Sequence, residues 1–98
     1  MYNEPARYAP VMSGGVRLES RVAVISIIVE DGDAVTELNS LLHDYSQYII
    51  GRMGIPYRER KISIICLAID APNDRINALT GALGRIKGLR AKATYSAV

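Results

Sequence analysis

With 98 residues the chain is long enough for one domain, but a chain this short buries only about 60 to 65 per cent of its unfolded surface as a monomer. Its composition, with 49% apolar and 22% charged residues and a formal charge of +2, is that of an ordinary globular protein and does not by itself indicate a nucleic acid partner. A single cysteine, Cys66, excludes an intramolecular disulfide framework and a cysteine-rich zinc site.

Residues 1–20 show no periodic pattern, and they contain two prolines, a Gly-Gly pair and scattered charges. We interpret them as a flexible or partner-bound tail, and residues 21–98 as the domain. No apolar run approaches the roughly 18 residues that span a membrane, and the first segment has no apolar signal-peptide core. We therefore expect a cytoplasmic protein without a membrane partner.

Residues 21–29 (RVAVISIIV) predict the first strand, because they are rich in β-branched side chains and bounded by charges. Its two faces would carry Val22, Val24, Ser26 and Ile28, and Ala23, Ile25, Ile27 and Val29. Both faces are largely apolar, whereas a strand with one face in water should alternate. We therefore expect both faces of this strand to be buried away from water.

Residues 30–33 form a turn that leads into the first helix, with Asp33 as the expected N-cap. Apolar residues then recur at helical spacing and define one face: Ala34, Val35, Leu38, Leu41, Leu42 and Tyr45. His43 points away from this face. Because no second His or Cys stands four residues from it, we interpret His43 as a solvated side chain.

The middle of the chain predicts a hairpin of two strands, near residues 48–56 and 62–69, joined by a charged turn. Pro56 cannot donate to a strand ladder, so the second strand should lie at an edge of the sheet. Gly51 and Gly54 lack side chains, which indicates a bulge or the close approach of another group. The third strand is apolar on both faces, and Cys66 within it is interpreted as a small buried apolar residue.

Pro72 suits the entry to a second helix, whose inward stripe is formed by Ile76, Leu79 and Leu83. Gly81 and Gly84 weaken a helix by about 1 kcal/mol each relative to alanine, so each marks either close packing or the helix end. Residues 89–96 then alternate between apolar and polar side chains. They predict a last strand with one face in water.

The order β-α-β-β-α-β predicts an α+β fold, a ferredoxin-like sandwich with an antiparallel sheet in the order 4-1-3-2 and two helices on one face. Strands one and three would be central, and strands two and four would form the edges. Because the helices cover one face only, the second apolar face must be covered in another way. We therefore expect a homo-oligomer, a dimer or larger, the alternative being a monomer whose tail folds over the sheet.

The segment of residues 48–59, with its central GRMGIPY motif, resembles a family of iron-only hydrogenase system regulators. Matching residues also occur in both central strands and in the second helix: Ile28-Val29-Glu30, Ser63-Ile64-Ile65 and Leu79-Thr80-Gly81. The resemblance therefore covers roughly residues 21 to 96. The family is similar to ACT domains and to the C-terminal domain of nickel-responsive repressors. Those modules are ferredoxin-like, oligomerise through their sheets and bind a small effector at subunit interfaces.

The resemblance implies a non-enzymatic, ACT-like regulatory module with a small-molecule ligand near the turn after the first strand. That turn contains Asp31, Gly32 and Asp33, and Gly32 stands where ACT domains often have a glycine that lets the backbone approach a ligand. The nickel site of the repressors uses several histidines, whereas this chain has one. Neither a metal nor a cofactor is therefore expected.

Arg52, flanked by Gly51 and Gly54, is a further candidate ligand-binding residue. A guanidinium on an edge strand can pair with a carboxylate or phosphate in fork geometry. The alternative is an ordinary solvated or intersubunit arginine.

Two other function classes remain as alternatives. Arg85, Lys87, Arg90 and Lys92 form a basic stripe that could contact nucleic acid in a dimer, but no aromatic residues alternate with them, and binding by this chain alone is not expected. Residues 51–54 are faintly similar to the arginine loop of acylphosphatases, although that loop follows the first strand. Cys66 and His43 fall on different elements, so we predict no catalytic residues.

Overall fold

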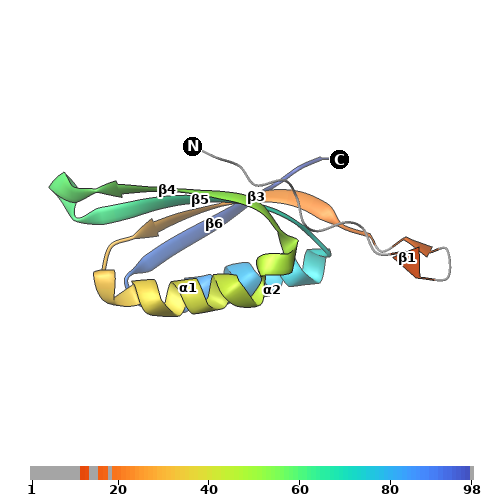
Figure 1. Ribbon diagram of the computed structural model, residues 1–98, viewed down its shortest axis with the longest axis horizontal. Helices are drawn as coiled ribbons and strands as arrows, with labels where there is room; N and C mark the ends of the chain where they lie inside the picture. Colours follow the sequence, from red (N-terminus) through yellow and green to blue (C-terminus); the bar gives the residue numbers. More distant parts are fainter. Residues whose placement is uncertain (1–11, 14–15, 18, 98) are drawn as a thin grey trace.

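The computed structural model describes residues 12–13, 16–17 and 19–97 (Figure 1). Four antiparallel strands form the main sheet: β3 (Arg21–Val29), β4 (Ile49–Tyr57), β5 (Ile62–Ala71) and β6 (Leu89–Tyr95). Two helices, α1 (Val35–Asp44) and α2 (Asn73–Gly84), form a second layer, and short 3-10 turns occupy Gly32–Ala34 (η1), Ser46–Tyr48 (η2) and Arg58–Arg60 (η3). This arrangement confirms the predicted α+β fold and is consistent with a ferredoxin-like sandwich.

The predicted tail lies mostly outside the described residues. Its described part includes two short strands, β1 (Met12–Ser13) and β2 (Val16–Arg17), which pair antiparallel to each other. The division at residue 20 stays a prediction.

The strands of the main sheet lie in the order β4-β5-β3-β6. If the four strands are numbered by their order in the domain, the sheet from the β6 edge runs fourth, first, third, second. The two strands that are apolar on both faces, β3 and β5, are therefore central, and the strand with Pro56 lies at an edge. A register shift between Ile49 and Gly51 gives β4 the irregularity that its glycines predicted.

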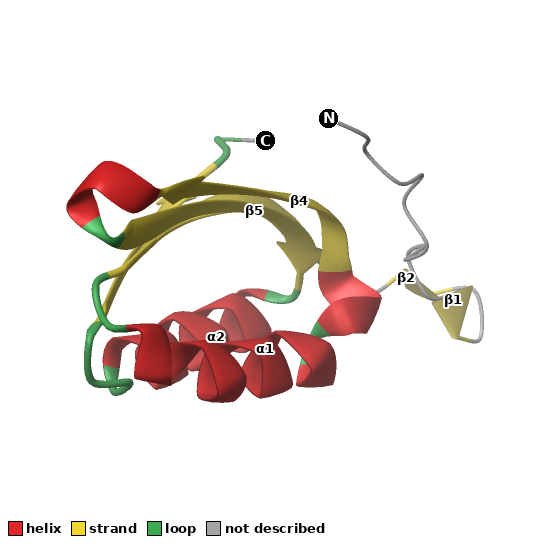
Figure 2. Cartoon of the chain, turned by 60° about the vertical axis from the view of Figure 1, so that its left-hand side comes forward, coloured by secondary structure: helices red, strands yellow, loops and turns green. Residues whose placement is uncertain are grey.

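The core lies between one face of the sheet and the two helices (Figure 2). Ile25 of β3, Leu67 of β5 and Ile76 of α2 are fully buried there. Each buried aliphatic side chain of this size stabilises the fold by roughly 1.5–3 kcal/mol. The helices therefore cover the inner face over the central strands β3 and β5, and both lie on the same side of the sheet.

On the opposite side of the sheet, here called the outer face, no helix of the described residues lies (Figure 2). The strand registers place these residues on it: Gly51, Met53, Ile55 and Tyr57 of β4, Ile62, Ile64, Cys66, Ala68 and Asp70 of β5, Val22, Val24, Ser26 and Ile28 of β3, and Arg90, Lys92 and Thr94 of β6. The second apolar face of the central strands is thus confirmed. Cys66 is only partly buried on this face, so its interpretation as a core residue was wrong for a single chain.

The start of α1 also differs from the sequence-based expectation. Asp33 is not the cap: Asp31 caps the turn η1, where its carboxylate accepts the N–H of Asp33 at 2.9 Å, and α1 itself begins after Ala34 without a side-chain cap. The turn η1 precedes α1, and Val35, the first residue of α1, is 39% exposed although its spacing placed it in the core. Leu38 and Leu42 are buried as expected. Neither α1 nor α2, nor any other described helix, is long and apolar enough to cross a membrane.

Candidate functional site

The turn after β3 is held closed by the turn before β6. The backbone N–H groups of Glu30 and Asp31 donate to the carbonyl oxygen of Gly88 at 2.7 and 3.2 Å. Gly88 has φ +84°, and a Cβ atom there would lie 2.4 Å from Cβ of Asp31. A side chain at this position would therefore be strained by its backbone and would also collide with the neighbouring turn.

Gly32, in contrast, has open space around it. A Cβ atom at Gly32 would meet nothing within 4 Å, and its backbone is outside the left-handed region. The described part of the chain therefore gives no steric reason for a glycine there. The carboxylate of Asp31 already accepts the N–H of Asp33, and both side chains are acidic. The turn should therefore bind an anion less favourably than an uncapped helix N-terminus would.

Arg52 lies exposed on β4 directly opposite Leu67 of β5, so its side chain starts from the helix side of the sheet. Gly51 adjoins the register shift, and a Cβ atom at Gly54 would be in ordinary contact with Ile65 at 3.9 Å. The glycines therefore shape an edge strand and do not enclose a pocket around Arg52.

The structure does not bring the two groups of predicted ligand-binding residues together within one chain. The ladder places Arg52 at the level of Leu67 and Ile25, whereas the turn follows Val29 at the end of β3. Four residues of strand correspond to about 13 Å, and two strand spacings separate β4 from β3 by about 10 Å. A small ligand could touch both groups only across a subunit boundary.

The four basic residues of the predicted nucleic acid stripe also separate. Arg85 follows α2 in the helical layer, and Lys87 lies in the turn before β6. Arg90 and Lys92 lie on the outer face, where Nε of Arg90 donates to Glu30 at 3.1 Å. The stripe is therefore continuous in sequence but divided between two layers of the fold.

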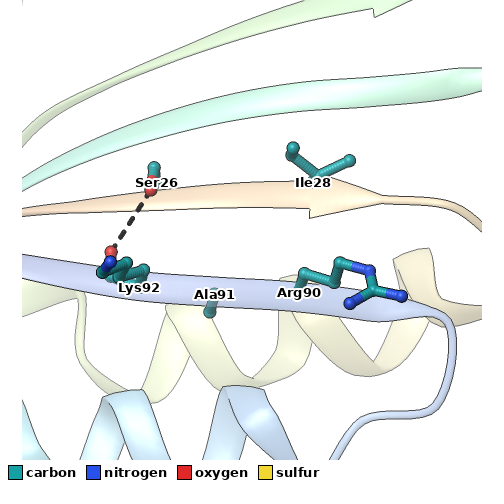
Figure 3. A pocket seen from close by; sticks show the side chains of 5 residues that line it. All are labelled: Ser26, Ile28, Arg90, Ala91 and Lys92. Atoms are coloured by element: carbon teal, nitrogen blue, oxygen red, sulfur yellow. Dashed lines mark hydrogen bonds between the residues drawn. The ribbon is translucent and has the colours of Figure 1, made fainter.

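A shallow hollow of about 150 Å³ lies on the outer face between β3 and β6 (Figure 3). Its lining comes from Ser26, Ile28, Arg90, Ala91 and Lys92. The Ser26 hydroxyl donates to the carbonyl oxygen of Lys92 over a long 3.4 Å, while Ala91 points away toward the helices (Figure 3). Sequence analysis singled out the two basic residues but missed Ser26, because only the strand register places it beside them.

Among the described residues, no group of side chains is arranged for metal binding or for nucleophilic catalysis. No three His, Cys, Asp or Glu side chains of this part of the chain gather into a potential metal site. His43 is exposed in α1, whereas Cys66 lies on the outer face of the sheet, on the other side of the core. These two side chains therefore cannot form a nucleophile–base pair in one chain.

Comparisons with known proteins agree with one another. Residues 21–93 match the model of a family described as "TM1266-like: Iron-only hydrogenase system regulator, putative". Among solved structures, the chain is similar to the uncharacterised protein TM1266 from Thermotoga maritima, with 40% sequence identity and a TM-score of 0.76. The match covers 79% of this chain and 98% of that one. No curated protein matches.

Proposed function

This chain belongs to the TM1266-like family of iron-only hydrogenase system regulators, and we propose that it acts as a non-enzymatic regulatory module whose working form is a homo-oligomer joined through the outer face. The proposal includes no catalytic step. The family supports the regulatory role, and the exposed apolar side chains support the mode of assembly.

One observation carries the assembly proposal. Among the described residues, seven of the eight exposed large apolar side chains lie on the outer face: Val22, Val24, Ile28, Met53, Ile55, Tyr57 and Ile64. The eighth is Val35 in α1. Apolar side chains scattered singly over a surface need no explanation, but a continuous apolar sheet face indicates a binding surface.

The size of this face fits a second copy of the chain. Strands of nine residues at about 3.3 Å each, and four strands about 4.8 Å apart, span roughly 30 by 19 Å. Two such faces packed together would bury on the order of 1,000 Å² in total, which reaches the lower range of specific interfaces. Two sheets packed in this way lie about 10 Å apart, and the side chains between them interdigitate, as in a sandwich.

The substitution Ile64→Lys tests the assembly. Ile64 lies between Ile28 and Ile55 on the outer face, so a lysine there would place an unpaired charge inside the proposed interface. We expect wild-type protein to be a dimer or larger by size-exclusion chromatography with light scattering, and Ile64→Lys to be a monomer. Val35→Lys is the matched control, because it exchanges an equally exposed apolar residue on the helical side and should leave the assembly unchanged.

Circular dichroism of both variants would verify that they fold. A wild-type monomer at micromolar concentration, or equal loss of assembly in both variants, would contradict the proposed interface. In the organism that encodes the chain, its deletion should alter iron-only hydrogenase activity. Val35→Lys should restore the wild-type level, whereas Ile64→Lys should not.

Ligand sensing is the finer part of this proposal. Gly32 gives an outside molecule unobstructed access to the backbone, and Arg52 offers a guanidinium, but one chain holds them far apart. We therefore assign any effector that uses both to a subunit boundary. Calorimetric titration with amino acids and nucleotides, comparing wild type with Arg52→Ala, tests this assignment, and identical heats for both proteins would remove Arg52 from it.

A further inference from the structure

We propose that the hollow between β3 and β6 binds a small oxyanion, a phosphate or carboxylate group, through Lys92, Arg90 and the Ser26 hydroxyl. This site differs from the Gly32 turn and from Arg52. It lies on the outer face itself, beside the apolar residues of the proposed interface.

The strand register brings the three polar groups together. Arg90 and Lys92 are two residues apart on β6, so their side chains leave the same face at a spacing of about 7 Å. Ser26 stands directly opposite Lys92, and Ile28 opposite Arg90. Because the Ser26 hydroxyl makes only a 3.4 Å bond to the Lys92 carbonyl, it can rotate and donate to a better acceptor in the hollow.

The charge in the hollow is positive and incompletely neutralised. Arg90 gives its Nε–H to Glu30, which leaves the remaining guanidinium N–H groups available. Lys92 has no carboxylate partner within the described part of the chain. An oxyanion would therefore receive charge-assisted hydrogen bonds from one ammonium and one guanidinium.

Apolar residues surround the hollow, so a bound anion would matter most for assembly, when a second copy covers the outer face. In this respect the inference rests on the proposed function. Val24 and Ile28 flank Ser26 along β3. A second copy on this face would remove water from Lys92, and a buried ammonium without a partner is strongly unfavourable. A bound anion would offset that cost, so it should strengthen assembly.

The size of the hollow limits the ligand. Its volume of about 150 Å³ is below the roughly 300–1,000 Å³ of sites for drug-sized molecules. A single phosphate or carboxylate group fits this space, whereas a whole nucleotide would extend beyond it.

The test is an NMR titration of backbone amides with sodium phosphate, and separately with sodium citrate, against sodium chloride at equal ionic strength. We expect saturating shifts at Ser26, Ile28 and Lys92 with phosphate, citrate or both, and none with chloride. Lys92→Gln should weaken binding by about tenfold or more. Lys87→Gln removes the same charge from the turn outside the hollow and should change binding by less than about twofold.

Two results would overturn the site. One is the absence of a saturating shift beyond that of chloride, and the other is equal weakening by Lys92→Gln and Lys87→Gln, which would indicate diffuse screening. Ser26→Ala provides a further variant that keeps the strand and its charges, and it should weaken the anion several-fold.

Light scattering with and without phosphate separates this inference from the proposed function. If the protein is an oligomer but binds no anion, the anion site is wrong and the proposed assembly stands. If it is a monomer that binds anion, the proposed assembly is wrong and the anion site stands. A carboxylate could also come from Asp70 of the second copy, since Asp70 lies on the outer face. If Asp70→Asn and Lys92→Gln weaken assembly equally and free anions have no effect, the free-anion site is wrong.

Discussion

At Gly88, a single carbonyl oxygen accepts two N–H groups from the turn after β3, and the backbone has φ +84°. Gly88→Ala should therefore destabilise the protein by at least about 2 kcal/mol, from left-handed strain and from the collision with Asp31. Urea unfolding followed by circular dichroism measures this loss.

Gly32→Ala is the control for that experiment, because it changes the same residue type in the adjoining turn. Open space surrounds Gly32, so the substitution should change stability by less than about 0.5 kcal/mol. Similar destabilisation by both substitutions would show that the two glycines are under equal constraint.

Individual residues also show where sequence reasoning reaches its limit. The composition of the turn after the first strand predicted Asp33 as the N-cap, and this was wrong: Asp31 caps a 3-10 turn that precedes the helix, and that turn has no strong signal in the sequence. Val35, the first residue of α1, also lies outside the core. The constraint on Gly88 could not be read from the sequence, since its close contact with Asp31 joins positions far apart in sequence.

At the scale of elements, α2 contains a glycine that the structure does not require. Gly81 is exposed in the middle of the helix, and a Cβ atom there would meet only the flexible Arg85 guanidinium, at 3.6 Å. Gly81→Ala should therefore stabilise the protein by about 0.5–1 kcal/mol through helix propensity and a less flexible unfolded chain.

Thermal unfolding of Gly81→Ala should show a melting temperature above that of wild type. An unchanged or lower melting temperature would mean that this position of α2 is in contact with something outside the single chain, such as a second copy. Gly84, as the last residue of α2, marks the helix end that sequence analysis allowed for either glycine.

Elements with a strong pattern were predictable almost to the residue. The β-branched run of the first strand gave Arg21–Val29 with its true ends, whereas the hairpin strands extend one or two residues beyond Pro56 and Ile69. The sequence pattern predicted which strands are central because proline and charged side chains are typical of edge strands, whereas β3 and β5 carry few of them. The hollow could not be predicted, because Ser26 meets Lys92 only through a register set by the whole sheet.

For the whole molecule, the Cys66 thiol reports on the outer face. It is partly buried in one chain and would be fully covered in an assembly through this face. Its reaction with a disulfide reagent should therefore become on the order of tenfold faster as the protein is diluted through its dissociation range. Absorbance of the released thiol measures the rate.

Guanidinium-unfolded protein at the same concentrations is the control, because its thiol should react at one rate throughout. If light scattering shows an oligomer whose Cys66 reacts at the same rate before and after dissociation, the subunits meet through another surface. The outer face would then need a different partner.

The position of β3 also has a consequence for the time course of folding. It is the first strand of the domain, yet it pairs on one side with β6, where Ile28 meets Arg90. During synthesis this apolar strand therefore waits without one of its neighbours until the last strand has left the ribosome. The local β4–β5 hairpin can close much earlier, since its pairing spans few residues. Folding should be gated by the slow, long-range closure at β6, and the nascent chain is most exposed to aggregation just before that strand arrives.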